Sequence, residues 1–175
     1  MVSELRLLIL GLLARQPRTA YALGRSFSAM PATVHSGSPG AIYPAVTALQ
    51  REGLVERDLG PNGESRGQPY SLTRKGRQVL ADWLSQPIEG WDLVKSPGTV
   101  LLRLSFVSSK SARQQLRSDL SLAASAALEE LQEYQELAGL DLADSSRESL
   151  ELTASLFRAY VAWARQGIEA TTGAA

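Results

Sequence analysis

The sequence contains no cysteine, a single histidine and only three lysines among its 175 residues. Without cysteine there is no disulfide framework, no thiolate zinc site and no cysteine nucleophile. One histidine cannot build a histidine-rich metal cage and gives little acid–base capacity near pH 7. We therefore expect no metal and no other cofactor, and the composition suits a reducing compartment.

Long hydrophobic runs are also missing. The longest run near the start, residues 7–14, has eight residues, whereas a membrane-spanning helix needs about 20. Glu4 precedes this run, and no small-residue cleavage site of a signal peptide follows it. We expect a cytoplasmic protein that has no membrane partner.

Several enzyme motifs are absent as well. The sequence has no G-x-G-x-x-G, no phosphate-loop lysine motif and no H-E-x-x-H. The glutamates within residues 129–136 have the pattern of a solvated helix face. These observations argue against an enzyme.

The charges are balanced over the chain but divided unevenly between its halves. Residues 1–86 carry ten Lys and Arg against six Asp and Glu, and residues 87–175 carry eight against twelve. The halves therefore have net charges of +4 and −4. A basic half suits a polyanionic partner, although an excess of this size also arises by chance.

Helix and strand signals in the basic half follow a recognisable order. The pattern predicts helices that begin after Ser3, Thr19 and Ser38, the last with proline at its first position and Gly53 just beyond its end. Two short strands, residues 54–59 and 70–72, flank a turn rich in proline, asparagine and glycine. A further helix follows Thr73. This order is that of a winged helix-turn-helix.

The third predicted helix has the amphipathic pattern of a recognition helix. Its apolar residues Ile42, Val46 and Leu49 would face the core. A helix in the major groove must offer hydrogen-bonding groups to base edges, while a basic wing contacts the backbone. The predicted DNA-binding residues are Tyr21, Ser38, Tyr43, Thr47, Gln50, Arg51, Arg66, Gln68, Arg74 and Lys75.

The same segments resemble the PadR-type transcriptional regulators. The resemblance is carried by Leu8-Ile9-Leu10-Gly11-Leu12-Leu13, by Gly40-Ala41-Ile42-Tyr43-Pro44-Ala45-Val46-Thr47-Ala48-Leu49, and by the wing Arg66-Gly67-Gln68-Pro69-Tyr70-Ser71-Leu72-Thr73-Arg74-Lys75-Gly76. It implies a homodimeric repressor that binds a double-stranded DNA operator and is released by an effector. It also implies that Tyr43 and Thr47 face DNA. Ala20-Tyr21-Ala22 departs from the family's usual glycine, tyrosine and acidic residue.

The acidic half is predicted to be helical, with long helices over residues 110–138 and from a Ser145-x-x-Glu148 capping box to about residue 170. Apolar residues recur at spacings of four and three in both helices, and the last helix has a second apolar stripe that needs a partner. The predicted dimerisation residues are Leu120, Leu131, Leu150, Leu152, Leu156, Phe157 and Val161. The alternative is a two-helix hairpin packed only on its own chain.

A weaker hypothesis places a small-molecule effector beside Trp91, Tyr160 and Trp163, although aromatic residues at helical spacing are more often core. Taken together, the sequence predicts a mainly α protein. A winged helix domain with a two-stranded wing covers residues 1–86, a linker covers 87–98, and an all-helical dimerisation domain covers 99–175. The alternative function is a winged-helix module that binds protein or RNA.

Overall fold

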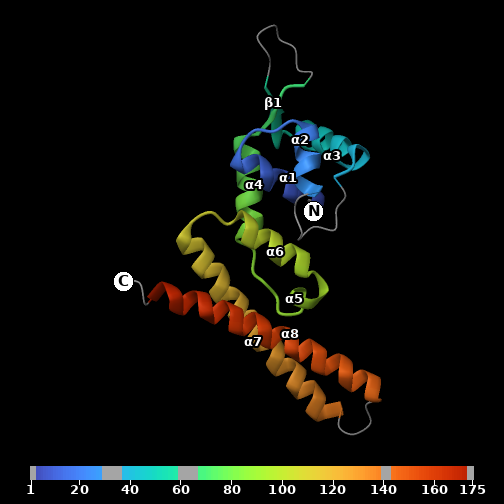
Figure 1. Ribbon diagram of the computed structural model, residues 1–175, viewed down its shortest axis with the longest axis vertical. Helices are drawn as coiled ribbons and strands as arrows, with labels where there is room; N and C mark the ends of the chain where they lie inside the picture. The colour runs from blue at the N-terminus through green and yellow to red at the C-terminus, as the bar shows by residue number, and fades with distance from the viewer. Residues whose placement is uncertain (1–2, 29–36, 59–66, 139–142, 173–175) are drawn as a thin grey trace. The chain divides into compact units, whose positions relative to one another are not determined.

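The computed structural model describes residues 3–28, 37–58, 67–138 and 143–172. The chain forms two compact units: residues 1–86 with 101–106, and residues 87–100 with 107–175 (Figure 1). The fold is mainly helical with one two-stranded antiparallel sheet, which confirms the predicted fold class. The bounds are α1 (Glu4–Arg15), α2 (Ala20–Ser28), α3 (Pro39–Arg51), β1 (Val55–Arg57), β2 (Tyr70–Leu72), α4 (Arg74–Leu84), α5 (Asp92–Lys95), α6 (Pro97–Phe106), α7 (Lys110–Ala138) and α8 (Asp144–Thr172).

The ends of α3 follow the predicted sequence signals. Ser38 has the extended backbone of an N-cap, and Pro39 occupies the first turn, where a missing N–H costs nothing. At the other end Gly53 has φ +71°, and the Leu54 N–H donates to the Leu49 carbonyl at 2.9 Å. This pattern is a Schellman motif, which a residue with a Cβ would strain. Helix α3 therefore has two firmly defined ends.

The sheet of the wing is short and regular. Val55 pairs with Leu72 and Arg57 with Tyr70 in antiparallel register. Arg18 adds an isolated bridge to Tyr70 through two backbone hydrogen bonds of 2.8 and 3.1 Å, which ties the α1–α2 connection to the sheet. The turn of the predicted hairpin, residues 59–66, lies outside the described residues.

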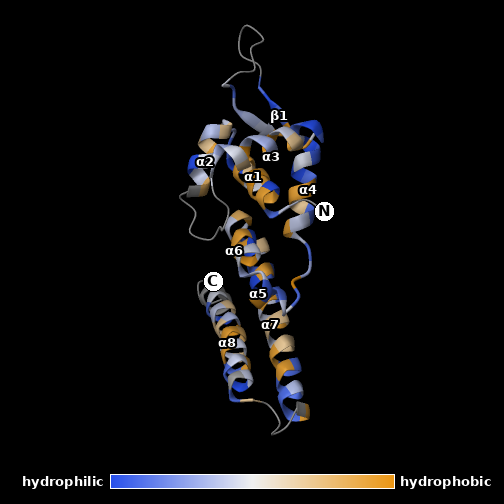
Figure 2. Cartoon of the chain, turned by 90° about the vertical axis from the view of Figure 1, so that its right-hand side faces the viewer, coloured by the Kyte–Doolittle hydropathy of each residue, from blue (hydrophilic) through white to orange (hydrophobic). Residues whose placement is uncertain are grey.

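The core of the first unit contains residues from α6 as well as from α1–α4 and the sheet. Leu102 is fully buried, and the Phe106 ring lies so close to Gly11 that a Cβ added there would meet ring atoms at 2.6 Å. Hydrophobic residues are concentrated on α1 and α6 in Figure 2. Residues 101–106 therefore complete the core of the winged-helix unit although they follow it by 15 residues in the chain.

Arg103 is the buried charged residue of this α6 segment. It is 6% exposed, and its Nη2 donates to the Leu84 carbonyl at 2.9 Å and to the Gln86 carbonyl. A cation beside the last carbonyls of α4 satisfies acceptors that the helix leaves unpaired and complements its dipole. Arg103 therefore fastens α6 to the C-terminal end of α4 within the first unit.

In the second unit, α7 and α8 are antiparallel neighbours (Figure 1). The short helix α5 packs against α8 through Leu93, which is 1% exposed.

Residues 87–98, expected as a linker, thus include a helix and the beginning of α6. The prediction that the last helix begins at the capping box is also corrected, because α8 begins at Asp144 and the Ser146 and Arg147 N–H groups bond the Ala143 carbonyl. Among the described residues no helix is both long enough and apolar enough to cross a membrane.

Candidate nucleic-acid interface

The two faces of α3 differ sharply in exposure. Ile42, Val46 and Leu49 are at most 1% exposed and belong to the core, as predicted. Tyr43 is 50% exposed, and Thr47 is also exposed. Since residues four apart share a helix face, the sequence GAIYPAVTALQR places its hydrogen-bonding side chains together on the outside. The described residues of the first unit do not cover this face.

A shallow hollow lies on the outer face of α3. It is lined by Tyr43, Pro44, Thr47, Ala48 and Arg51. Three of these residues were predicted to bind DNA, and the hollow brings them together. Pro44 and Ala48 were quoted only for the family resemblance, and their spacing of four was the signal that would have placed them on this face.

The charged residues around α3 differ in their surroundings. Glu52, directly after the helix, forms an ion pair with Arg6. Lys75 donates from its Nζ to the Glu52 carbonyl at 2.9 Å, so part of its hydrogen-bonding capacity serves the end of α3. Arg51 and Arg74 are exposed. Their guanidinium groups are placed to meet a polyanion.

The other predicted DNA-binding residues have mixed surroundings. Tyr21 is 69% exposed on α2, a helix that packs against α3. Ser38 and Gln50 are exposed, and Gln68 is half-buried at the base of the wing. Arg66 lies outside the described residues. Arg57, on β1, places its guanidinium 4.5 Å from the centre of the Tyr70 ring, so it packs on the sheet.

The predicted dimerisation residues separate into two groups. Leu120, Leu131 and Phe157 are at most 2% exposed, and they lie in the seam where α7 packs on α8. Because their own chain already covers them, they cannot serve as contacts to a partner, and this part of the prediction is corrected. Leu150 and Val161 are partly buried.

The second apolar stripe of α8 consists of Leu152, Leu156, Ala159 and Trp163, and it is exposed to solvent. Leu152 is 64% exposed, Leu156 41% and Trp163 39%. Ala159 is exposed on the same side. Trp163 is partly covered by its own chain, whereas Leu152 and Leu156 leave apolar surface exposed to solvent.

Each of the three aromatic residues of the predicted effector site makes contacts within its own chain. Trp91 packs edge-on against Phe157 with ring centroids 5.6 Å apart and donates from Nε1 to Glu130 at 2.8 Å. The Tyr160 hydroxyl donates to the Leu93 carbonyl at 3.2 Å, and burial raises the pKa of Tyr160. These contacts hold α5 against α7 and α8.

Trp163 is engaged separately. The Arg117 guanidinium lies 4.0 Å from its ring centre and donates to its carbonyl at 3.1 Å. Gly167 permits this approach, because an added Cβ would stand 1.7 Å from an Arg117 nitrogen.

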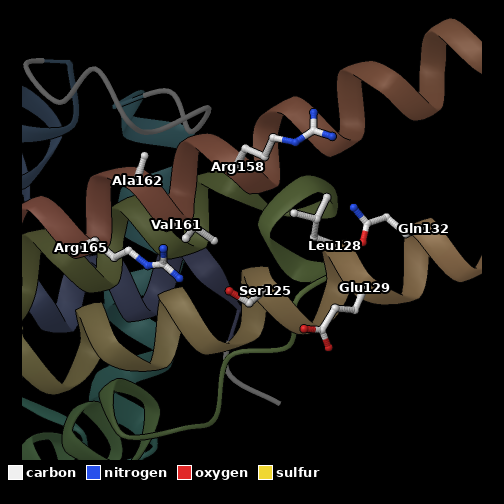
Figure 3. Close-up of a pocket in the computed structure, with 8 residues that line it drawn as sticks. All are labelled: Ser125, Leu128, Glu129, Gln132, Arg158, Val161, Ala162 and Arg165. Carbon is white, nitrogen blue, oxygen red and sulfur yellow. The ribbon is translucent and has the colours of Figure 1, made fainter.

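A groove of about 460 Å³ instead runs along the outside of the α7–α8 pair (Figure 3). Leu128 and Val161 lie between the two helices, and Arg158, Arg165 and Glu129 border them. Sequence reasoning missed this groove. The sequence did contain a signal for it, because Arg158 and Arg165 are seven residues apart on α8 and therefore lie on one side of the helix.

A comparison with protein-family models gives a match within the first unit. Residues 9–82 match the model described as the transcriptional regulator PadR-like family. A comparison with curated proteins found no match.

Among solved structures, the chain is similar to the PadR-like transcriptional regulator BC1756 from Bacillus cereus, with 20% identity, a TM-score of 0.42, and coverage of 98% of this chain and 100% of that one. It is similar to Bacillus subtilis PadR in complex with operator DNA, with 24% identity, a TM-score of 0.42, and coverage of 95% and 98%. It is also similar to Bacillus subtilis PadR in complex with p-coumaric acid, with 26% identity, a TM-score of 0.41, and coverage of 94% and 96%.

Proposed function

We propose that this chain, whose residues 9–82 match the PadR-like family of transcriptional regulators, is a homodimeric regulator that binds an operator in double-stranded DNA. In this proposal α3 enters the major groove. The wing and the start of α4 contact the phosphate backbone. The helical second unit joins two copies.

The observation that carries the proposal is the uncovered outer face of α3. It combines a half-exposed tyrosine, a threonine and an arginine on a helix whose inner face is fully buried. Such a face suits base edges, which present donors, acceptors and the thymine methyl group in the major groove. The excess of basic residues over residues 1–86 supplies attraction to phosphate.

The salt dependence of DNA binding tests the proposal. A protein that neutralises several phosphates loses affinity steeply with salt, because log K falls with log salt by about 0.9 for each phosphate contacted. Arg74→Ala should weaken binding to all duplexes alike and reduce that slope by about 1. Arg158→Ala, the same charge change on α8, is the matched control and should leave the slope unchanged.

Thr47→Ala examines base recognition separately from phosphate contacts. If Thr47 faces a base, its loss relaxes the preference at one position of the bound sequence and leaves the salt slope as it is. A flat salt slope and no preferred sequence would favour the alternative function, a winged-helix module for a protein partner. Equal binding of structured RNA would favour the RNA alternative.

A homodimer is supported by the exposed leucines of α8. Leu152 and Leu156 leave apolar surface exposed on a helix whose opposite face is already packed. A second copy that covers this stripe would also set two recognition helices at a fixed separation, as palindromic half-sites require.

We further propose that the chain represses transcription and that an effector lifts repression. The α7–α8 groove is the better place for a small molecule than the predicted Trp91, Tyr160 and Trp163 set, because those three side chains are occupied by intrachain contacts. Transcription from a promoter that carries the selected operator should rise when the gene for this chain is deleted. A fall would identify an activator instead.

A further inference from the structure

The hollow on α3 is mostly carbon. The side chains that line it carry the Pro44 ring, the methyl groups of Thr47 and Ala48, and the Tyr43 ring. The polar atoms of the lining are few: two hydroxyl groups and the Arg51 guanidinium. A recognition surface that worked through hydrogen bonds alone would not need this apolar floor.

Pro44, one of the residues that line the hollow, is also unusual because of its position in the helix. It stands inside α3, where it has no N–H to donate to the Gly40 carbonyl, and proline is the least favourable residue in a helix. Its side chain is exposed, so core packing does not explain it. What proline adds at this position is a rigid apolar surface that loses no rotamer freedom on binding.

We propose that this hollow receives the C5-methyl group of a thymine, so that the chain reads one base of its operator by shape. The inference rests on the proposed function and deepens it. Thymine is the base that presents a methyl group in the major groove. Cytosine has only a hydrogen at C5, so it would leave the hollow unfilled and lose the burial of that methyl group. Arg51 at the edge of the hollow complements the adjacent phosphate.

Uracil provides the test, because it differs from thymine only by that methyl group. Two random duplex pools of the same design are prepared, one with thymine and one with uracil throughout, and the full-length chain selects from each. Thymine should be enriched at a fixed position in the first pool, and that preference should disappear in the second. On the best duplex, replacing that one thymine by uracil should lower the affinity about fourfold, the value of one buried methyl group.

Two variants locate the effect in the hollow. Ala48→Ser puts a hydroxyl on the floor, and Pro44→Ala removes the ring while favouring the helix. Both should bring the thymine-to-uracil affinity ratio toward one. Gln50→Ala lies on the same helix outside the hollow, so it should lower affinity for both duplexes and keep their ratio.

The outcomes separate this inference from the function on which it rests. Enrichment of a sequence with equal affinity for the thymine and uracil duplexes would overturn the methyl hollow and leave operator binding intact. A thymine effect that persists in both Ala48→Ser and Pro44→Ala would also overturn it, since the methyl group would then bind elsewhere. No enrichment from either pool would overturn both.

Discussion

Tyr160 shows how one side chain joins two elements of the second unit. Its hydroxyl donates to the Leu93 carbonyl of α5, and burial raises its pKa above the ordinary value of 10.0. The folded chain therefore holds the phenol proton more tightly than the unfolded chain does. The resulting stabilisation is complete below about pH 10 and is lost as the pH rises through the raised pKa.

Tyr160→Phe should have two separable effects. Near pH 7 the free energy of unfolding should fall by about 0.5–1.5 kcal/mol, because the Leu93 carbonyl loses its donor. From about pH 9 to about pH 11 the variant should lose stability less steeply than the wild type, since it has no phenol to deprotonate at this site. Urea denaturation at several pH values measures both effects.

Tyr134→Phe is the control for this comparison, because Tyr134 is 53% exposed on α7 and forms no hydrogen bond to α5. It should keep the steeper decline of the wild type. If Tyr160→Phe declines as steeply as Tyr134→Phe, the contact between α5 and α8 does not depend on the protonated phenol.

At the scale of elements, local sequence signals were enough to predict a helix end wherever that end is formed by neighbouring residues. Ser38-Pro39 and Gly53 predicted both ends of α3, and Thr73 predicted the start of α4, where its Oγ1 accepts from the Gly76 N–H at 3.0 Å. The pattern missed α5, because four residues are too short for any period. It also missed the Arg18 bridge, which depends on tertiary contact with Tyr70.

The packing of α6 on α1 also lay beyond sequence reasoning. Gly11 and Phe106 are 95 positions apart, and neither residue predicts the other. The same limit applies to the outer face of α3. Spacing predicted that Tyr43 and Thr47 face outward, but the shape of the hollow depends on all five side chains that line it. The spacing of apolar residues along α8 also did not predict which of its two stripes packs on α7.

Two glycine substitutions test the α1–α6 contact. Gly11→Ala should destabilise the chain by about 1–3 kcal/mol, because its Cβ has no room against the Phe106 ring. Gly40→Ala is the matched substitution in α3, where a Cβ meets nothing within 4 Å. It should be neutral or stabilise by up to about 1 kcal/mol. Chemical denaturation compares the two variants.

The contact predicts a rescue as well. Adding Phe106→Leu to Gly11→Ala should recover part of the lost stability, because the smaller side chain makes space for the new methyl group. Additive losses in the double variant would contradict direct packing between these two positions.

At the scale of the whole molecule, the proposed homodimer depends on the exposed stripe of α8. Leu152→Glu combined with Leu156→Glu should give a monomer in light scattering at micromolar concentration, because two charges cannot be buried in an apolar interface without partners. The helical circular dichroism should be retained, since both side chains are exposed in the single chain.

Leu122→Glu is the control for this prediction. Leu122 is 73% exposed on α7, outside the α8 stripe. The Leu122→Glu chain should remain dimeric, and its operator affinity should exceed that of the monomeric double variant. A double variant that still forms dimers would place the interface on another surface.

Because residues 101–106 belong to the core of the winged-helix unit, that unit is discontinuous along the chain. During synthesis, the ribosome must deliver about 20 further residues after position 86 before the last core side chain is present. At the usual elongation rate of about 5–20 residues per second this is a delay of roughly one to four seconds. A nascent chain that stops short of Phe106 has an incomplete winged-helix core, so truncated translation products would compete poorly for the proposed operator.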